Sequence, residues 1–212
     1  MDLKNIRQEY MQKPLEIEKF QLDPIGLLKQ WYQDAIDSNI SLVNAMTLST
    51  VTEDGFPNSR VVLAKDISDK GLIIYTDYNS QKGREIEKNS NVAALIFWKE
   101  QDRQIRIKAK ASKIEREESD KYFKSRPKES QISASASLQS SSVTIEALTQ
   151  KVTNLISQYK DEDSLPCPKN WGGYFLEFVE IEFWQGRPNR LHDRFHFLLR
   201  DGEWSTFNRL SP

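Results

Sequence analysis

Apolar residues recur with two different periods along the chain, and the period separates helical from extended segments. Over residues 24–38 the apolar positions are three to four apart, which predicts an amphipathic helix. Asp23 is a suitable N-cap for this helix, because an Asp side chain accepts hydrogen bonds from the free backbone N–H groups of the first turn. Pro24 suits the first helical position, because proline has no backbone N–H that would need a partner. Further helices are expected over residues 80–90, over 115–129 up to a break at Arg126-Pro127, and over 143–160. The Ser/Ala-rich stretch 131–142 has the composition of a linker.

A period of two is typical of strands, and it governs most of the remaining chain. The expected strands cover residues 45–51, 59–65, 71–77, 91–98, 103–115, 174–184, 194–200 and 203–210. The pairs Asp54-Gly55 and Asp201-Gly202 mark hairpin turns. The run 91–98 (NVAALIFW) is apolar at nearly every position, which predicts a strand buried on both faces.

The order of these elements predicts the fold class. Strands dominate residues 45–112 and 173–209 without alternating one by one with helices, so parallel βαβ units are not expected. We therefore predict a mainly β protein with flanking helices (α+β), built on an antiparallel barrel that uses both halves of the chain. In this interpretation residues 23–212 form one domain, and residues 1–22 form a flexible N-terminal arm.

Composition excludes several classes of protein. The 212 residues contain 30 Lys and Arg against 31 Asp and Glu, so no overall positive field attracts nucleic acid. The sequence has no apolar run of about 18 residues to span a membrane, and its charged N-terminus lacks the apolar core of a signal peptide. We therefore expect no membrane partner, and the one cysteine, Cys167, fits a cytoplasmic protein. Gly-rich phosphate-binding strings are absent, so a nucleotide site must use side chains.

Two charged patterns have an ordinary explanation beside a functional one. Basic residues alternate along 103–113, which suits either a nucleic-acid surface or a solvated strand face. Because no aromatic residues are interleaved with them, the solvated face is favoured. His192 and His196 are four apart, but they lie in a strand pattern without a visible third ligand, so we expect no metal.

Four clusters of polar and charged residues lie near the ends of expected strands or helices. Three of them can bind a phosphate without a glycine loop, since guanidinium and ammonium groups replace backbone N–H donors. These three run over residues 60–65, 80–82 and 122–126. The fourth, Arg190-Leu191-His192-Asp193-Arg194, either faces an anion or forms a salt-bridged turn with nearby glutamates.

Nine strings of the sequence resemble those of one known family. They are RVVLAK (60–65), IIYTDYNSQK (73–82), RQIRIKAKA (103–111), YFKSRPKESQI (122–132), LQSS (138–141), WGGY (171–174), IEFWQG (181–186), RLHDRF (190–195) and RLSP (209–212). Together and in this order, they resemble the pyridoxine (pyridoxamine) 5′-phosphate oxidases, the FMN enzymes that make pyridoxal 5′-phosphate. The resemblance implies a split β-barrel of the FMN-binding type, and a homodimer with FMN in the subunit interface.

The resemblance also implies roles for individual residues. It places FMN against Arg60, Val61, Val62, Leu63, Ala64, Lys65, Tyr75, Thr76, Gln81, Lys82, Gln104, Gln139, Ser140, Trp184 and Arg194. It places the substrate against Arg7, Tyr10, Lys65, Tyr122, Arg126, Ser130, Arg190, Leu191 and His192, with the segment around Arg7 and Tyr10 as its cover. Arg190 and His192 are the expected catalytic residues, and which of them acts as the base, if either does, stays open. Gln81 departs from the family, which usually carries an arginine there for the FMN phosphate.

The implied reaction is oxidation at C4′ of pyridoxine or pyridoxamine 5′-phosphate, with O2 reduced to H2O2. The expected partners are these small molecules and a second copy of the chain. The alternative is a non-catalytic flavin or pyridoxal-phosphate binding protein on the same barrel, because fold alone does not determine function. The strings RLHDR and YFKSRP favour the enzyme, since a bare flavin binder needs no substrate cluster.

Overall fold

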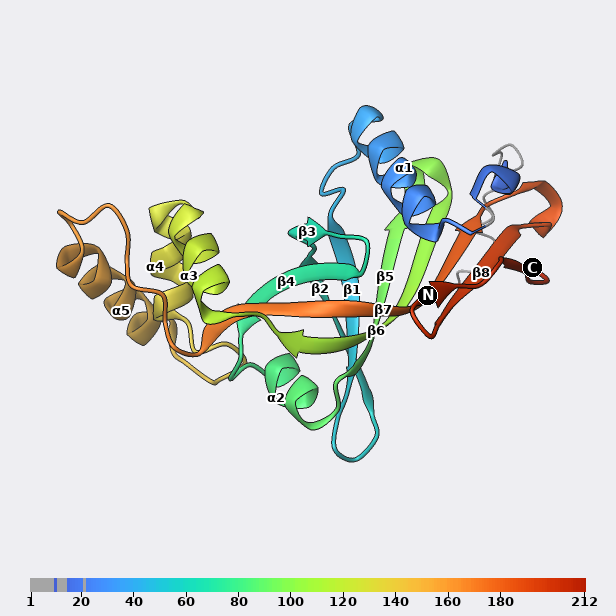
Figure 1. Ribbon diagram of the computed structural model, residues 1–212. Coiled ribbons are helices and arrows are strands. Elements are labelled where there is room, and N and C mark those ends of the chain that lie inside the picture. The colour runs from blue at the N-terminus through green and yellow to red at the C-terminus, as the bar shows by residue number, and fades with distance from the viewer. Residues whose placement is uncertain (1–9, 11–14, 21) are drawn as a thin grey trace, which may run out of the picture.

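The computed structural model describes residues 10, 15–20 and 22–212 (Figure 1). Its strands are β1 (Ala45–Val51), β2 (Pro57–Leu63), β3 (Asp66–Ile67), β4 (Gly71–Asp77), β5 (Asn91–Trp98), β6 (Arg103–Lys113), β7 (Trp171–Gln185), β8 (Asp193–Arg200), β9 (Glu203–Trp204) and β10 (Asn208–Arg209). Its helices are α1 (Pro24–Asp37), α2 (Gln81–Lys88), α3 (Arg116–Ser125), α4 (Lys128–Ala136) and α5 (Ile145–Gln158). Short 3-10 turns cover Ile17–Phe20, Lys99–Gln101 and Pro188–Arg190.

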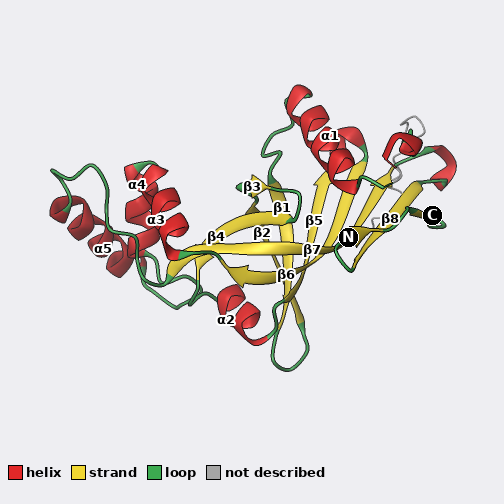
Figure 2. Cartoon of the chain, in the orientation of Figure 1, coloured by secondary structure: helices red, strands yellow, loops and turns green. Residues whose placement is uncertain are grey.

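The strands form one curled antiparallel sheet in the order β10-β8-β7-β6-β5-β1-β2. Strand β7 is the longest, with 15 residues, and β6 pairs with one of its edges from end to end. On its other edge β4 pairs with Trp171–Glu177 and β8 with Glu180–Gln185. Helices flank this sheet (Figure 2), which confirms the predicted mainly β fold with flanking helices.

The core lies on one side of the sheet and is rich in aromatic residues. Phe178, Phe183, Phe195 and Phe197 are at most 1% exposed. Helix α1 covers part of this side: the Trp31 ring meets Phe183 edge-on at 5.2 Å, and Tyr32 meets Trp98 in the same way at 5.0 Å. As predicted, Asp23 caps α1, because its side chain accepts from the Gly26 backbone N–H at 2.7 Å. None of the described helices is both long and apolar enough to cross a bilayer.

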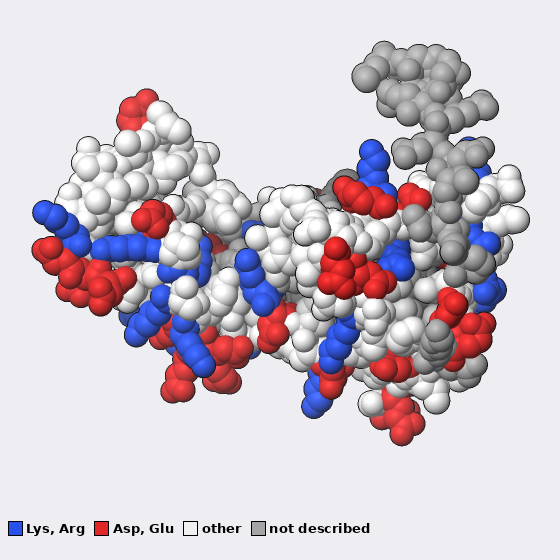
Figure 3. Space-filling model, turned by 90° about the horizontal axis from the view of Figure 1, so that it is seen from above, with Lys and Arg blue, Asp and Glu red and all other residues white. Residues whose placement is uncertain are grey.

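Two basic residues of β6 are paired with carboxylates of the neighbouring strand β7. Arg106 Nη1 lies 2.9 Å from Glu182 Oε2, and Lys108 Nζ lies 2.9 Å from Glu180 Oε2. Figure 3 shows blue and red side chains interspersed over the face it displays. These ion pairs favour the solvated strand face over a nucleic-acid surface.

Three sequence-based predictions about local structure are wrong. The expected strand over 203–210 is instead two short strands, β9 and β10, with residues 205–207 between them outside any strand. Strand β5 is buried on one face only: Val92, Ala94 and Ile96 face the core, whereas the Phe97 side is open and Phe97 is 51% exposed. The reason is that α1 covers a single side of the sheet. The expected linker over 131–142 begins as helix α4, in which Gln131 and Ile132 are buried.

Serine is compatible with helix α4 because its hydroxyls bond to the helix itself. Ser133 Oγ donates to the Glu129 carbonyl at 2.8 Å, and Ser135 Oγ donates to the Gln131 carbonyl at 2.9 Å. The Gln131 amide in turn donates to the Arg126 carbonyl at 2.9 Å, which joins α4 to the end of α3. Composition alone therefore misassigned a segment whose polar groups are satisfied locally.

The predicted N-terminal arm lies largely outside the described residues, as does Arg7. Of the part that is described, Ile17 is fully buried, and Leu15 and Phe20 pack against the same core. The segment Ile17–Phe20 is therefore docked on the domain. The covering role of the arm stays a prediction.

The start of α2 packs so closely that we expect alanine at Gly83 to destabilise the protein. A Cβ on Gly83 would lie 2.1 Å from the Tyr78 carbonyl oxygen. In an open helix, Gly→Ala stabilises by about 0.5–1 kcal/mol, but overpacking against backbone costs about 1–3 kcal/mol. Urea unfolding of Gly83→Ala should therefore show a loss of stability, while the exposed control Lys88→Ala stays within about 0.5 kcal/mol. A gain in stability for Gly83→Ala would contradict this packing.

Candidate active site

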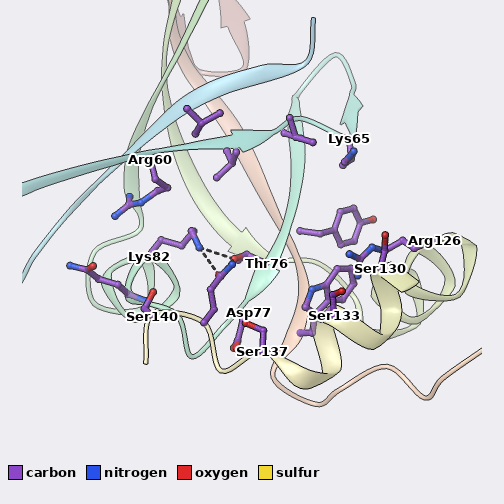
Figure 4. A pocket seen from close by; sticks show the side chains of 18 of the residues that line it. Arg60, Lys65, Thr76, Asp77, Lys82, Arg126, Ser130, Ser133, Ser137 and Ser140 are labelled. Carbon is purple, nitrogen blue, oxygen red and sulfur yellow. Dashed lines mark hydrogen bonds between the residues drawn. The ribbon is translucent and has the colours of Figure 1, made fainter. Parts of the chain in front are cut away.

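A pocket of about 960 Å³ lies between the sheet edge and the α3–α4 helices (Figure 4). Strands β2 and β4, the start of α2, the α3–α4 junction and the segment after α4 form its walls. The expected site residues that line it are Arg60, Val61, Val62, Leu63, Lys65, Tyr75, Thr76, Gln81, Lys82, Tyr122, Arg126, Ser130, Gln139 and Ser140. The structure thus brings together residues that are up to 80 positions apart in the chain.

One end of the pocket holds a buried lysine. Lys82 is 8% exposed, and its Nζ donates to Thr76 Oγ1 at 3.0 Å and to Gln139 Oε1 at 2.7 Å. Burial and the nearby Arg60 charge lower the pKa of Lys82 to about 8. Figure 4 shows Lys82, Arg60 and Ser140 on the same side of the pocket. A cation with so low a pKa gains from an anion beside it, and Lys82 lies at the positive end of the α2 dipole.

Arg60 at this end is held from behind by a buried carboxylate. Its Nη2 lies 3.2 Å from Glu85 Oε2, and its Nη1 donates to Thr50 Oγ1 at 2.5 Å. Glu85, which is 7% exposed, also accepts from the Asn58 amide at 2.5 Å and from the Thr50 hydroxyl. Burial raises the pKa of Glu85, but these hydrogen bonds and the Arg60 charge outweigh burial and lower it overall. The guanidinium is therefore fixed in place at the pocket wall.

Gln81 lines the pocket at the same end, where its backbone N–H donates to Ser140 Oγ at 3.1 Å. Arg84, one helical turn further on, donates to the Asn79 carbonyl and does not line this pocket. In this structure Arg84 therefore does not replace the charge that an arginine at position 81 would bring.

The other end of the pocket combines stacked rings with a second set of cations. Tyr75 stacks on Tyr122 with ring centroids 3.8 Å apart and on Trp171 at 5.4 Å. The Arg126 guanidinium lies over the Trp171 ring at 4.9 Å. Among the described residues, Arg126 Nη1 is buried with no hydrogen-bond partner. Because leaving a buried donor unpaired costs about 1–3 kcal/mol, this atom marks a place for an acceptor.

Lys65 and Ser130 line this second end beside Arg126 (Figure 4). Two groups of cations therefore lie at opposite ends of one pocket, with aromatic rings beside one of them. That arrangement suits two anionic groups at once, each attached to a flat ring system.

Several residues that line this pocket were not predicted as site residues. They are Asn58, Ser59, Asp77, Pro127, Ser133, Ala134, Ser137 and Trp171. A signal was present for three of them, because Ser133, Ala134 and Ser137 continue from Ser130 at the spacing of one helical face. The linker interpretation hid that spacing. Ala64, in contrast, was expected at the cofactor but is 4% exposed and does not line the pocket.

The remaining predicted residues lie elsewhere, around the far end of β7. Trp184 and His192 have ring centroids 4.7 Å apart, and the Tyr10 ring meets each of them edge-on at 5.3 Å. Gln104 pairs with Trp184 across β6 and β7. Arg194 Nε lies 2.9 Å from Glu182 Oε1, so part of the RLHDR string forms the salt-bridged turn considered above.

The turn before β8 presents exposed side chains and a histidine in a defined orientation. Arg190 and Leu191 are exposed, and Leu191 is 68% so. The Arg187 backbone N–H donates to His192 Nδ1 at 3.1 Å, which leaves the proton of the neutral ring on Nε2. Burial and the Arg190 charge lower the pKa of His192, so the ring is neutral at pH 7.

The two groups of predicted residues are far apart within one chain. Trp171 contacts Arg126 and the first group, whereas Trp184 contacts His192 and the second. Both tryptophans belong to β7, 13 residues apart, which is about 40 Å along a strand. One chain therefore presents the two groups at opposite ends of β7. His192 and His196 do not form a metal site with other ligands within the described residues.

Comparison with known proteins identifies relatives along the whole chain. One family model, described as pyridoxamine 5′-phosphate oxidase, matches residues 32–155. A second, described as the pyridoxine 5′-phosphate oxidase C-terminal dimerisation region, matches residues 171–212. A pyridoxine/pyridoxamine 5′-phosphate oxidase of Leptospira interrogans is 44% identical over 216 residues, which cover 99% of this chain and 98% of the relative.

Two solved structures share the fold. PhzG from Burkholderia lata, in complex with tetrahydrophenazine-1-carboxylic acid, has a TM-score of 0.89 at 32% identity, covering 95% of this chain and 99% of that one. A pyridoxamine 5′-phosphate oxidase-related, FMN binding protein from Nostoc punctiforme has a TM-score of 0.71 at 15% identity, covering 91% and 100%. These matches confirm the predicted split β-barrel.

The low pKa of Lys82 predicts how anion binding at this end depends on pH. Below about pH 8 the Lys82 amine already carries its proton when no anion is bound. Above about pH 8 it is mostly neutral, and it must take up a proton from solvent to pair with the anion. The affinity for FMN, the ligand expected from the sequence, should therefore fall by up to about tenfold per pH unit above about 8. Quenching of FMN fluorescence measures it. Lys82→Met should bind more weakly with a flat profile, and an equally steep fall in this variant would assign the titration to another group.

Proposed function

The chain belongs to the pyridoxine/pyridoxamine 5′-phosphate oxidase family, and from that premise we propose how its residues oxidise pyridoxine 5′-phosphate and pyridoxamine 5′-phosphate to pyridoxal 5′-phosphate. The cofactor in this proposal is FMN, and the oxidant is O2. The reactions balance as pyridoxine 5′-phosphate and O2 giving pyridoxal 5′-phosphate and H2O2, with water consumed and ammonia released for the amine. The working unit is a homodimer.

The observation that carries the proposal is the pair of cationic ends in one pocket. We assign the FMN phosphate to the Lys82 and Arg60 end, where the amine is buried and its pKa is low. We assign the substrate phosphate to the Arg126 end, where Nη1 is buried and lacks a partner among the described residues. Lys65 and Ser130 supply a further charge and a hydroxyl there. The residues present therefore fit one mononucleotide and one phosphate monoester.

When bound, FMN supplies the redox chemistry, by accepting a hydride from C4′ of the substrate and passing the electrons to O2. The protein's own residues bind and orient. Arg126 and Lys65 fix the substrate phosphate, and the stacked Tyr75, Tyr122 and Trp171 rings give the site an apolar, water-poor wall. Such positioning lowers the entropic part of the barrier, because C4′ is already held against its hydride acceptor.

His192 and Arg190 act on the C4′ substituent in this proposal. Since His192 is neutral with its proton on Nε2, it donates a hydrogen bond to the C4′ oxygen or nitrogen rather than removing a proton. Arg190 is exposed and brings a permanent positive charge to the same group. These two residues lie about 40 Å along β7 from the Arg126 end, so the partner copy must supply them.

The proposal is tested first by the identity of the cofactor and by peroxide release. Heat should release FMN from the purified protein, identified against FMN and FAD standards by chromatography. Adding pyridoxine 5′-phosphate or pyridoxamine 5′-phosphate under air should yield H2O2 and pyridoxal 5′-phosphate in equal amounts. Flavin binding without peroxide from either substrate would favour the non-catalytic flavin-binding alternative instead. Release of FAD would refute the cofactor assignment.

Mixing two inactive variants tests whether each site uses two chains. Arg126→Ala disables the part of the site that lies in the pocket, and His192→Ala disables the part that lies at the far end of β7. In a mixed dimer one of the two sites has both halves intact, so random reassociation should restore about one quarter of the parental turnover. The control is each variant unfolded and reassociated with itself, which should stay inactive. No recovery in a verified mixed dimer would show that both halves serve the same chain's site.

A further inference from the structure

A buried carboxylate beside the expected catalytic histidine joins three separate segments of the chain. Asp193, at the start of β8, is 5% exposed. Its Oδ2 accepts from the Leu15 backbone N–H at 3.2 Å and from Arg187 Nη1 at 2.9 Å. Its Oδ1 accepts from Arg209 Nη1 at 2.7 Å. The N-terminal segment, the turn before His192 and the C-terminal strand β10 therefore meet at one side chain.

The bond to Leu15 limits where Tyr10 can lie. The two are five positions apart, and an extended chain of that length reaches at most about 17 Å. The Tyr10 ring lies in a notch formed by Trp184, Gly186 and His192. A Cβ on Gly186 would approach the Tyr10 ring to 2.8 Å, so the absence of a side chain there makes room for the ring. By holding Leu15, Asp193 thus restricts how far Tyr10 can lie from His192.

The bond to Arg187 restrains the turn that carries the expected catalytic residues. Arg187 is tied twice, by its guanidinium to Asp193 and by its backbone N–H to His192 Nδ1. Beyond it, Asn189 and Arg190 both have positive φ, at 57° and 60°. Left-handed backbone costs a residue with a side chain roughly 1–2 kcal/mol, so the ends of this turn must be held for it to persist.

We propose that Asp193 is a positioning residue, which keeps Tyr10 and the Arg190–His192 turn in one arrangement for binding the substrate. This inference rests on the proposed function. Asp193 acts through Tyr10, Arg190 and His192. A purely structural ion pair would stabilise the domain as a whole, whereas a positioning residue changes substrate and product binding with little effect on FMN.

The experiment is a double-mutant cycle of Asp193→Asn with Tyr10→Ala in the full-length holoenzyme. Asparagine preserves the shape of the side chain but removes the charge that faces Arg187 and Arg209. We expect Asp193→Asn to raise the KM for pyridoxine 5′-phosphate about tenfold, with kcat changed by less than about threefold and FMN affinity unchanged. In the Tyr10→Ala background the same substitution should raise KM by less than about threefold, because residues that act as one unit are not additive.

A control and a second readout separate the possible outcomes. Asp34→Asn breaks another partly buried ion pair, to Arg103 at 2.7 Å, and should leave KM unchanged. The dissociation constant of pyridoxal 5′-phosphate, measured by equilibrium dialysis, should show the same non-additivity in the double-mutant cycle. This measurement does not depend on turnover. Additive effects in both readouts, or a parallel loss of FMN affinity, would overturn the positioning role. If Asp193→Asn does not fold, Arg209→Met removes one contact from a half-exposed partner and should give a smaller, equally non-additive change.

The failure of this inference differs from the failure of the proposed function. A parent protein that binds pyridoxal 5′-phosphate but releases no peroxide would refute the oxidase, while the binding cycle would still test Asp193. An active parent whose Asp193→Asn variant keeps normal KM and normal product affinity would refute the role of Asp193 alone.

Discussion

Strand β7 determines where every part of the candidate site lies. Its 15 residues are paired with β6 on one edge, and with β4 and then β8 on the other. A strand that is bonded on both edges cannot shift register without turning its side chains to the opposite face. The separation between Trp171 at one end and Trp184 at the other is therefore set by backbone hydrogen bonds. The division of the expected site residues into two groups follows from that separation.

Charge burial is the second constraint, and it explains why the pocket suits anions. The buried carboxylates Glu85, Glu182 and Asp193 each have a guanidinium partner within 3.2 Å. In contrast, the amine of Lys82 is neighboured by neutral oxygens, and Arg126 Nη1 has no acceptor within the described part of the chain. These three carboxylates are thus stabilised internally, whereas the Lys82 amine and Arg126 Nη1, at the two ends of one pocket, have no anionic hydrogen-bond partner within the described part of the chain. An anion that enters each end relieves this cost, and part of its binding free energy comes from that relief.

Sequence patterns predicted most of the fold, because period and turn residues are local properties. Helix α1 with its Asp23 cap and the strands up to β8 appear where the apolar period places them. What failed depends on tertiary contacts. Whether the Phe97 side of β5 is buried depends on what covers it. The serines of α4 have the composition of a linker, and only the structure shows that their hydroxyls bond to the helix backbone.

The candidate site shows the same division between local and distant information. The resemblance named side chains such as Lys82, Arg126 and His192 as contacts of the cofactor or the substrate, but it carried no distances between them. Strand register alone places Trp171 and Trp184 about 40 Å apart along β7. Asp193 was visible in the RLHDR string, yet its partners Leu15 and Arg209 lie at the two ends of the chain. Sequence spacing cannot reveal such a contact, because the fold creates it.

The open face of the sheet connects assembly with catalysis. Thr47 on β1 pairs with Val61 on one side and Leu95 on the other, so these residues lie in one row across three strands. Val61 is 69% exposed, and Phe97, two positions beyond Leu95 on the same face, is 51% exposed. A second copy that covers this apolar row buries surface that the single chain leaves in water. Val61 also lines the pocket. A contact over this row therefore lies beside the pocket, where the proposed function calls for the partner's Arg190 and His192. In that proposal, a ligand that bridges the two copies stabilises the dimer by mass action.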